Sequence, residues 1–163
     1  MEPTENNQNT STAKIDKEGS IELLSFVVGN HVYSVDIMKV REIRGWTETT
    51  SLPHAPSYVR GVINLRGTVL PVIDLALRLG LDAEEPTARN VVIVVDVSNT
   101  PVGLRVDAVS DILTINSEDL IPPPEFTDDI SGTFLSAVTL VNEKMIRVLD
   151  LSQTLPRKSD IAA

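Results

Sequence analysis

The sequence contains no cysteine among its 163 residues, and that absence excludes several kinds of chemistry. Disulfides, thiolate nucleophiles and zinc-thiolate sites all require cysteine, so none of them can form. Aromatic side chains are also few, with one Trp, two Tyr and three Phe, which leaves little for a surface that stacks bases or sugars. The two histidines, His31 and His54, are not spaced from each other or from a carboxylate like metal ligands. We therefore expect neither a metal nor a cofactor.

Clusters of Lys and Arg are missing as well. The formal net charge is −9 and the isoelectric point is about 4.6, whereas nucleic acids and anionic membranes bind clustered basic residues. The longest purely apolar run, Val91 to Val95, is far too short to span a bilayer. The first twenty residues are rich in Asn, Thr, Ser and Glu and lack the apolar core of a signal peptide. We expect a cytoplasmic protein that binds no nucleic acid and does not insert into the membrane.

Motifs of well-known catalytic sites are absent too. The sequence has neither the Gly-x-Ser-x-Gly pattern of hydrolases nor the Gly-x-x-x-x-Gly-Lys pattern of phosphate-binding loops. Asp96 follows a run of valines, as the catalytic residue of an aspartic protease would, but such enzymes pair two aspartate loops. The position that corresponds to Asp96 in the internal repeat described below is Val27, so the second carboxylate is missing. We expect no enzymatic activity.

What the chain does contain, from Ile21 onward, is short runs rich in Val and Ile that are separated by Gly, Pro and Asn. This pattern is typical of an all-β domain, whereas residues 1–19 are polar and predict a disordered tail. Helical turns are expected at Asp36–Lys39 and Asn116–Leu120. Ten strands are predicted: Glu22–Val28, Val32–Val35, Arg41–Arg44, Gly61–Leu65, Val69–Ile73, Val91–Val97, Val102–Val106, Ser110–Ile115, Ser136–Val141 and Met145–Leu149.

The sequence also matches itself at two offsets. At an offset of 69 residues, the segment 24–43 aligns with the segment 93–112, and their apolar positions coincide. At an offset of 76 residues, the segment 58–75 aligns with the segment 134–151. The change of offset falls in the linker that carries Ile121-Pro122-Pro123-Pro124, a stiff piece of chain. The two halves therefore share one order of about five strands.

Such a duplication predicts two small five-stranded β-barrels related by pseudo-symmetry. The first would span residues 20–88 and the second residues 89–155, followed by a C-terminal tail at residues 156–163. Two barrels side by side form a groove at their junction, and a groove with apolar walls is suited to binding a helix.

Asp74 and Asp150 occupy equivalent positions in the repeat and could be read as twin catalytic carboxylates. Each follows a strand and precedes a helix-like stretch, where an aspartate side chain accepts hydrogen bonds from free backbone N–H groups. Leucines four residues apart then fall on one face of each short helix. We therefore interpret both aspartates as helix N-caps.

Val32 to Gly45 holds more apolar residues than one face of a short strand can bury. Ile37, Val40 and Ile43 could line the groove between the barrels, or they could complete the barrel cores. The sequence leaves these two interpretations open.

Four stretches occur in a fixed order: VDIMKVREIRG, PSYVRGVINLRGTVLPVIDL, VVIVVDVSNTPVGLRVDAVSDILTI and IPPPEF. Together they resemble the CheW family, the coupling proteins of bacterial chemotaxis, over roughly residues 21–155. The resemblance implies a fold of two SH3-like, five-stranded β-barrels, which agrees with the repeat found independently.

The resemblance also implies a function. CheW-like proteins are adaptors without catalysis that link the cytoplasmic tip of methyl-accepting chemotaxis receptors to the regulatory domain of the histidine kinase CheA. They are expected to be monomeric alone, to form rings with the kinase within receptor arrays, and to be recruited from the cytoplasm to the inner face of the membrane.

Family positions transfer to particular residues. Glu42 and Arg66 match a charge pair implicated in receptor and kinase contact, and Val40 and Gly61 match positions where changes disturb coupling. Arg66 lies on a predicted two-residue turn. Asn64 and Gly67 flank it there, and Ile37 joins the set as a groove residue, which completes the expected partner-binding residues. In the repeat Glu42 corresponds to Asp111 and Arg66 to Asn142, so only the first half carries the charge pair.

Two other functions remain open at this point. The same scaffold could serve a non-flagellar chemosensory pathway that controls surface motility or second-messenger output. A detached regulatory domain of the kinase is the other possibility, which the polar N-terminal tail and the lack of an ATP-binding or phosphotransfer segment disfavour.

Overall fold

The structure is a computed structural model that describes residues 19–82, 84–123 and 134–157. The predicted N-terminal tail, up to residue 18, lies outside the described residues, as does the C-terminal tail from residue 158. All ten predicted strands are confirmed, and the four expected helical turns are present. The strands are β1 (Ser20–Val28), β2 (His31–Asp36), β3 (Val40–Gly45), β4 (Val59–Leu65), β5 (Thr68–Asp74), β6 (Val91–Val97), β7 (Thr100–Val106), β8 (Ala108–Asn116), β9 (Leu135–Val141) and β10 (Lys144–Leu149). The turns are η2 (Ile37–Lys39), α1 (Leu75–Arg78), η3 (Ser117–Asp119) and α2 (Leu151–Thr154).

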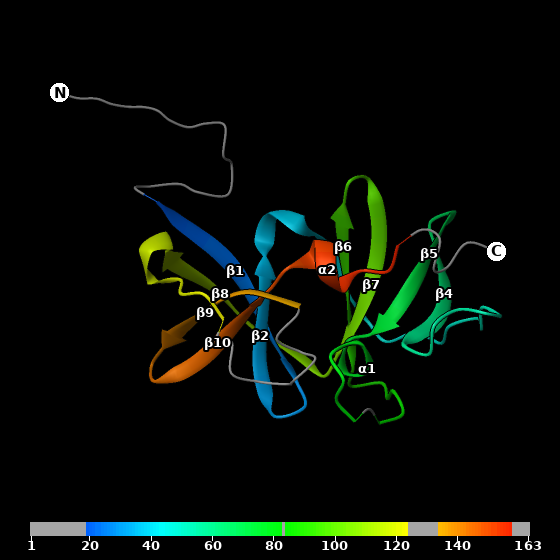
Figure 1. The fold of residues 1–163 in the computed structure, drawn as a ribbon. Helices are drawn as coiled ribbons and strands as arrows, with labels where there is room; N and C mark the ends of the chain where they lie inside the picture. The colour runs from blue at the N-terminus through cyan, green and yellow to red at the C-terminus, as the bar shows by residue number, and fades with distance from the viewer. Residues whose placement is uncertain (1–18, 83, 124–133, 158–163) are drawn as a thin grey trace.

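The strands form two five-stranded sheets, which confirms the all-β class. Sheet A has the order β8-β1-β2-β10-β9 and sheet B the order β3-β6-β7-β5-β4. Figure 1 shows the two sheets next to each other, with α2 between the strands of sheet A and those of sheet B. In each sheet, three pairs of neighbouring strands are antiparallel. The fourth pair is parallel: β2 with β10 in sheet A, and β7 with β5 in sheet B.

The division of the chain between the sheets differs from the expected barrels at residues 20–88 and 89–155. Sheet A combines β1 and β2 with three strands of the second half, and sheet B combines β6 and β7 with three strands of the first half. The two halves are therefore interleaved. Sequence self-similarity identifies equivalent strands but not which copy each one pairs with, the same ambiguity that permits domain swapping.

The strand register reproduces the internal repeat. Strands β1 and β8 pair with a bulge after Leu24, which lies opposite Ile112. Strands β6 and β3 pair with an equivalent bulge, between Val40 and Glu42. Next to it, Ile93 lies opposite Ile43, and Ile93 is the equivalent of Leu24 in the repeat. One sheet is thus a copy of the other down to its irregularities, as expected if the bulges arose before the duplication.

One apolar core joins the two sheets. It contains Phe26 and Val35 of sheet A together with Ile73, Ile93 and Leu104 of sheet B, all of them fully buried. Each sheet also has a smaller cluster of its own. Burial on this scale is the main stabilising contribution to the fold, and it fixes the two sheets relative to each other.

A cation holds the two halves together next to this core. The guanidinium of Arg78 on α1 lies 4.3 Å from the ring centre of Tyr58 and 4.8 Å from that of Phe134, two positions that the repeat makes equivalent. Its Nε also donates to the carbonyl of Thr154 at 2.7 Å, at the end of α2. Arg78 therefore connects α1 of the first half of the chain to the end of α2 in the second half.

The predicted helix caps are confirmed. Asp74 accepts a hydrogen bond from the N–H of Ala76 at 3.1 Å, and Asp150 accepts one from the N–H of Ser152 at 3.0 Å. The sequence did not indicate that Asp74 is also fully buried and paired with two arginines, whereas Asp150 is half-buried.

Candidate functional site

The β4–β5 hairpin displays Arg66 at its tip, as predicted. Arg66 and Gly67 both have positive φ values, 52° and 87°, and they connect Leu65 to Thr68, which pair across the strands. Two positive φ values are typical of the type I′ turn, which fits the twist of a hairpin. The side chain of Asn64 accepts a hydrogen bond from the Gly67 N–H at 2.9 Å. Asn64 and Gly67 thus fix the turn and present the Arg66 side chain, which is 70% exposed.

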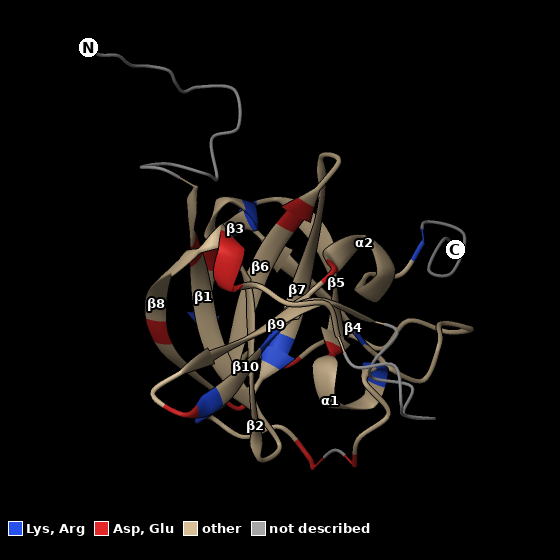
Figure 2. Ribbon diagram, turned by 60° about the vertical axis from the view of Figure 1, so that its left-hand side comes forward, with Lys and Arg blue, Asp and Glu red and all other residues tan. Residues whose placement is uncertain are grey.

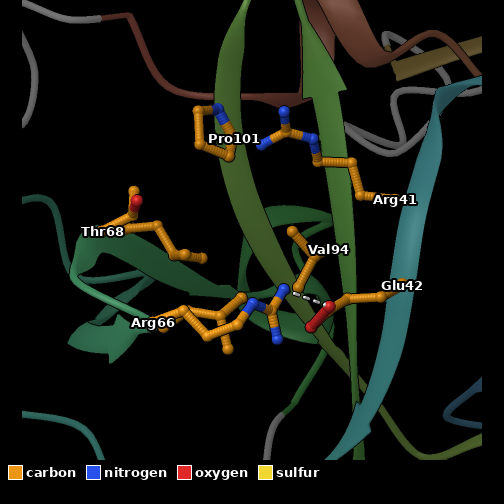
Figure 3. A pocket seen from close by; sticks show the side chains of 8 residues that line it. Arg41, Glu42, Arg66, Thr68, Val94 and Pro101 are labelled. Carbon is orange, nitrogen blue, oxygen red and sulfur yellow. Dashed lines mark hydrogen bonds and ion pairs between the residues drawn. The ribbon is translucent and has the colours of Figure 1, made fainter.

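Glu42 meets Arg66 from the edge strand β3. The Nη2 atom of Arg66 lies 2.6 Å from Oε1 of Glu42, and Figure 3 shows the two side chains pointing toward each other across the pocket. Arg44 donates to the other carboxylate oxygen, Oε2, at 3.4 Å. The hydrogen bond and charge of Arg66, with a smaller contribution from Arg44, lower the pKa of the Glu42 carboxyl below its ordinary value. Glu42 is therefore a carboxylate at neutral pH.

A β-bulge brings a third charged residue to the same place. The register of β3 with β6 shifts between Val40 and Glu42, so Arg41 departs from the usual alternation of faces and lines the pocket beside Glu42. The Nε of Arg41 lies 3.1 Å from Oδ2 of Asp96 on β6. Asp96, the residue that resembled a protease aspartate, is therefore an ion-pair partner.

The pocket between these side chains has a volume of about 370 Å³. Its charged lining consists of two arginines and one glutamate (Figure 3). Its apolar floor comes from Leu65, Leu70 and Val94. Guanidinium groups bind carboxylates with two parallel hydrogen bonds, and the floor accepts an apolar side chain. The pocket is thus suited to an acidic and partly apolar segment of another protein.

The other expected partner-binding residues lie elsewhere. Ile37 and Val40 are half-buried and pack against the large core, and neither lines this pocket. Ile43, which could have joined them, is 46% exposed on β3. Gly61 is buried in β4 at a φ of 143°, and a Cβ atom there would lie 2.3 Å from the backbone oxygen of Thr50. Its immediate role is to allow two backbone segments to approach closely.

Sequence reasoning missed Arg41 and Arg44. Arg44 could have been found, because residues two apart on a strand share a face and Arg44 stands two positions after Glu42. Arg41 could not, because the bulge that brings it into the same pocket as Glu42 leaves no mark in the residue pattern. The buried ion pairs of Asp74 with Arg60 and Arg105 were missed for a different reason. The three residues lie on three different strands, and these strands become neighbours only in the folded sheet.

The pocket has no chemically equivalent copy in sheet A, because Asn142 carries no charge where Arg66 stands in sheet B. The turn itself is repeated: Asn142 and Glu143 have φ values of 52° and 69°. Hairpin geometry is thus common to both sheets, whereas the charge pair belongs to sheet B alone.

Other kinds of site find no support in the described part of the chain. Among those residues, no group of three or more His, Asp or Glu is arranged to hold a metal ion. No helix that the structure describes is long and apolar enough to cross a membrane. In the view of Figure 2, Lys and Arg are scattered singly over several elements of the described ribbon and form no basic stripe.

Two duplicated β-sheets with an exposed charge pair beside an apolar floor define an all-β module with a surface suited to contact with another protein. Comparison with known proteins identifies it further: residues 22–159 match the model of the CheW-like domain. The chain is 48% identical to a chemotaxis protein CheW of Rhizobium meliloti over 94% of its length and 99% of that protein, and 36% identical to one of Klebsiella aerogenes over 82% and 81%. A crystal structure of the scaffolding protein TtCheW from Thermoanaerobacter tengcongensis superposes with a TM-score of 0.74 at 31% identity, over 80% of this chain and 88% of that one. This chain therefore belongs to the CheW family, the coupling adaptors of chemotaxis.

Proposed function

We propose that this protein couples methyl-accepting chemoreceptors to the histidine kinase CheA as a non-enzymatic adaptor, and that the pocket around Glu42 and Arg66 is one of its partner contacts. The observation that carries the proposal is the charge pair at an exposed hairpin tip. An exposed ion pair adds little to folding stability, so folding alone does not account for two arginines directed at one carboxylate.

The arrangement around Glu42 allows Arg66 to change partners. Arg66 is largely exposed, whereas Glu42 is 26% exposed and also bound by Arg44. If a carboxylate of the receptor or kinase takes the Arg66 guanidinium, Glu42 keeps Arg44 as a counter-ion and is not left as an unpaired charge. The exchange therefore does not leave the Glu42 carboxylate without a counter-charge.

Ile37, Val40 and Gly61 serve the same function from behind the site. Ile37 and Val40 anchor the start of β3 to the common core, and Gly61 lets β4 approach Thr50 closely. Each of these strands positions one member of the charge pair: β3 carries Glu42, and β4 leads into the turn that carries Arg66. Changes at these positions would displace the charges and weaken coupling without touching a partner.

We further propose that the protein acts in the cytoplasm at the inner face of the membrane, where it is monomeric alone and forms rings with the regulatory domain of the kinase. The relatives described above are named as chemotaxis proteins, which favours chemotaxis over a pathway for surface motility or second-messenger output.

The deciding experiment is co-sedimentation of this protein and its cognate CheA with receptor-containing membranes, with kinase activity measured in the pellet. Arg66→Glu should abolish receptor-dependent kinase activation while its melting temperature stays within about 3 °C of wild type. Arg89→Glu, which makes the same charge change at an exposed residue outside the pocket, is the matched control and should couple normally. If Arg66→Glu couples fully, the pocket around Glu42 and Arg66 is not a partner contact. If the wild-type protein does not sediment with receptors, the adaptor function is refuted.

A further inference from the structure

The pocket around Glu42 and Arg66 has a second ion pair beside it. Arg41 lines the same pocket, and in the view of Figure 3 Val94 lies between Arg41 and the first pair. The Nε atom of Arg41 lies 3.1 Å from Oδ2 of Asp96 on β6. The pocket therefore holds two guanidinium groups, and this chain supplies a counter-ion for each of them.

The strand register sets the distance between the two pairs. Glu42 of β3 lies opposite Val94 of β6, and Asp96 follows two positions later on β6. Residues two positions apart on a strand project from the same face and lie about 7 Å apart. Pro101, which lies opposite Asp96 on β7, also lines the pocket. One face of the sheet thus carries both counter-ions at a fixed spacing.

In both pairs the arginine is the exposed member and the carboxylate is the sheltered one. Arg66 is 70% exposed and Glu42 is 26% exposed. Arg41 is 58% exposed and Asp96 is 19% exposed. A guanidinium binds carboxylates through a planar fork of donors, so an exposed one is able to take a second carboxylate from a partner. Exposed ion pairs add little to folding stability, so folding does not account for two of them in one pocket.

The internal repeat supports a role other than folding. Ser110 and Val27 stand in sheet A at the places of Arg41 and Asp96, so the second pair is absent there, as the first one is. Both sheets form with the same strand order and equivalent bulges. An ion pair that the sheet needed in order to form would be expected in both copies. The two pairs instead occur together, in one pocket of one sheet.

We propose that the partner segment bound in this pocket presents two carboxylates, one for Arg66 and one for Arg41, together with an apolar side chain. The apolar floor of the pocket, Leu65, Leu70 and Val94, receives that side chain. Two carboxylates at the required spacing come from residues i and i+2 of an extended segment or from residues one turn apart on a helix. The inference rests on the proposed function, because it specifies the chemistry of the partner at the same site.

Binding is tested by NMR titration of the ¹⁵N-labelled full chain, at low ionic strength, with the blocked tripeptide acetyl-Glu-Leu-Glu-amide. Glu-Leu-Gln and Glu-Ser-Glu in the same blocked form are the comparison peptides. Glu-Leu-Glu should shift the amide resonances of residues 41–42, 65–68 and 94, with a dissociation constant about threefold to fivefold below that of Glu-Leu-Gln.

Three outcomes of this titration would count against the inference. A ratio of about twofold or less is the statistical advantage of two carboxylates competing for one arginine, and it would overturn the inference. Absence of shifts in these residues would do the same. Equal affinity for Glu-Ser-Glu and Glu-Leu-Glu would refute the apolar part of the proposed partner.

A double-mutant cycle then assigns the second carboxylate to Arg41. Arg41→Gln removes the guanidinium, so the preference for Glu-Leu-Glu over Glu-Leu-Gln should fall to about twofold or less. Its melting temperature should stay within about 3 °C of wild type, because the pair is exposed. Arg89→Gln makes the same change at an exposed residue outside the pocket and should keep the full preference. A preference that survives in Arg41→Gln would show that Arg41 does not bind the second carboxylate.

A third variant distinguishes a binding role from a structural one. Asp96→Asn removes the internal competitor for Arg41, so Glu-Leu-Glu should bind about twofold to fivefold more tightly than it binds the wild type. The gain should vanish when Arg41→Gln is added. A structural ion pair predicts the opposite result, a lower melting temperature with no gain in affinity.

These titrations contain neither receptor nor kinase, so their failure is distinguishable from failure of the coupling function. If Arg66→Glu abolishes coupling but the wild-type chain shows no preference for Glu-Leu-Glu, the pocket is a partner contact that does not bind two carboxylates.

Discussion

Arg66 donates a 2.6 Å hydrogen bond to Glu42, a residue 24 positions earlier in the chain and on a different strand of the same sheet. The pair closes one side of the pocket and joins the edge strand β3 to the β4–β5 turn. Because each member belongs to a separate element, their separation reports directly on the relative position of those elements.

The first prediction concerns the protonation of Glu42. Arg66 and Arg44 lower its pKa in the folded protein, so its side-chain carboxyl should titrate with a midpoint below the ordinary value of 4.5. Any stabilisation from the charged pair is therefore fully present above pH 4.5 and is lost as the pH falls through the lowered midpoint. An NMR titration of the carboxyl carbon measures this midpoint. Arg66→Ala should raise it more than Arg44→Ala does, and equal shifts would contradict the assigned order of the two arginines.

The second prediction concerns the pair as a unit. Combining Glu42→Arg with Arg66→Glu rebuilds an ion pair of reversed polarity, so kinase activation should be partly restored compared with Arg66→Glu alone. The measurement is receptor-dependent CheA activity in reconstituted membranes. If the double variant couples no better than the single one, Glu42 and Arg66 meet separate partner residues and their contact within the free protein is incidental to function.

A third prediction separates two glycines of the same hairpin. Gly61→Ala places a methyl group 2.3 Å from a backbone oxygen at an unfavourable φ, so it should lower the free energy of unfolding by about 2–4 kcal/mol. Gly67→Ala has no atom within 4 Å of the added methyl and strains only the turn, at a cost of about 1 kcal/mol. Urea denaturation of the two variants measures the difference. Comparable losses would mean that backbone strain alone, and not the approach to Thr50, decides the effect at Gly61.

The fourth prediction compares the two capping aspartates. Asp74→Ala leaves Arg60 and Arg105 without their carboxylate and should destabilise the fold by about 3–5 kcal/mol, the cost of an uncompensated buried charge. Asp150→Ala removes a helix cap only and should cost about 1 kcal/mol. Thermal and chemical denaturation give both values. Equal losses at the two positions would show that capping dominates at both and that the buried arginines tolerate the loss of Asp74.

Much of this molecule could be predicted from its residues. The positions of the strands follow from short Val- and Ile-rich runs, and the caps at Asp74 and Asp150 follow from an aspartate before a leucine-containing turn, because both signals are local. The Arg66 turn was equally local. The exchange of strands between the two halves was not predictable from self-similarity, since identical pairing rules apply within a half and between halves.

The residues of the site show the same difference between local signals and contacts that depend on the fold. Glu42, Arg66, Asn64 and Gly67 lie close together in the structure, and their contact with a partner stays a prediction. Ile37 and Val40 proved to pack against the core and not around the pocket, because alternation along a strand does not say which of two apolar surroundings a residue meets. Arg41 lines the pocket because of a bulge. A bulge is an irregularity of register that depends on the partner strand, so the sequence of one segment alone does not predict it.

The interleaving of the two halves bears on how such a chain can be built. A half-length protein with this strand order would have to exchange its first hairpin with a second copy to complete each sheet, and would exist as an intertwined homodimer. Joining the two copies end to end makes that association permanent and frees each copy to diverge. Sheet B has two arginines beside its capping aspartate, where sheet A has none, and it carries Arg66 at its hairpin tip, where sheet A has Asn142. A symmetric homodimer would offer every surface twice, whereas the two sheets of this chain offer different faces, and so give the molecule a direction.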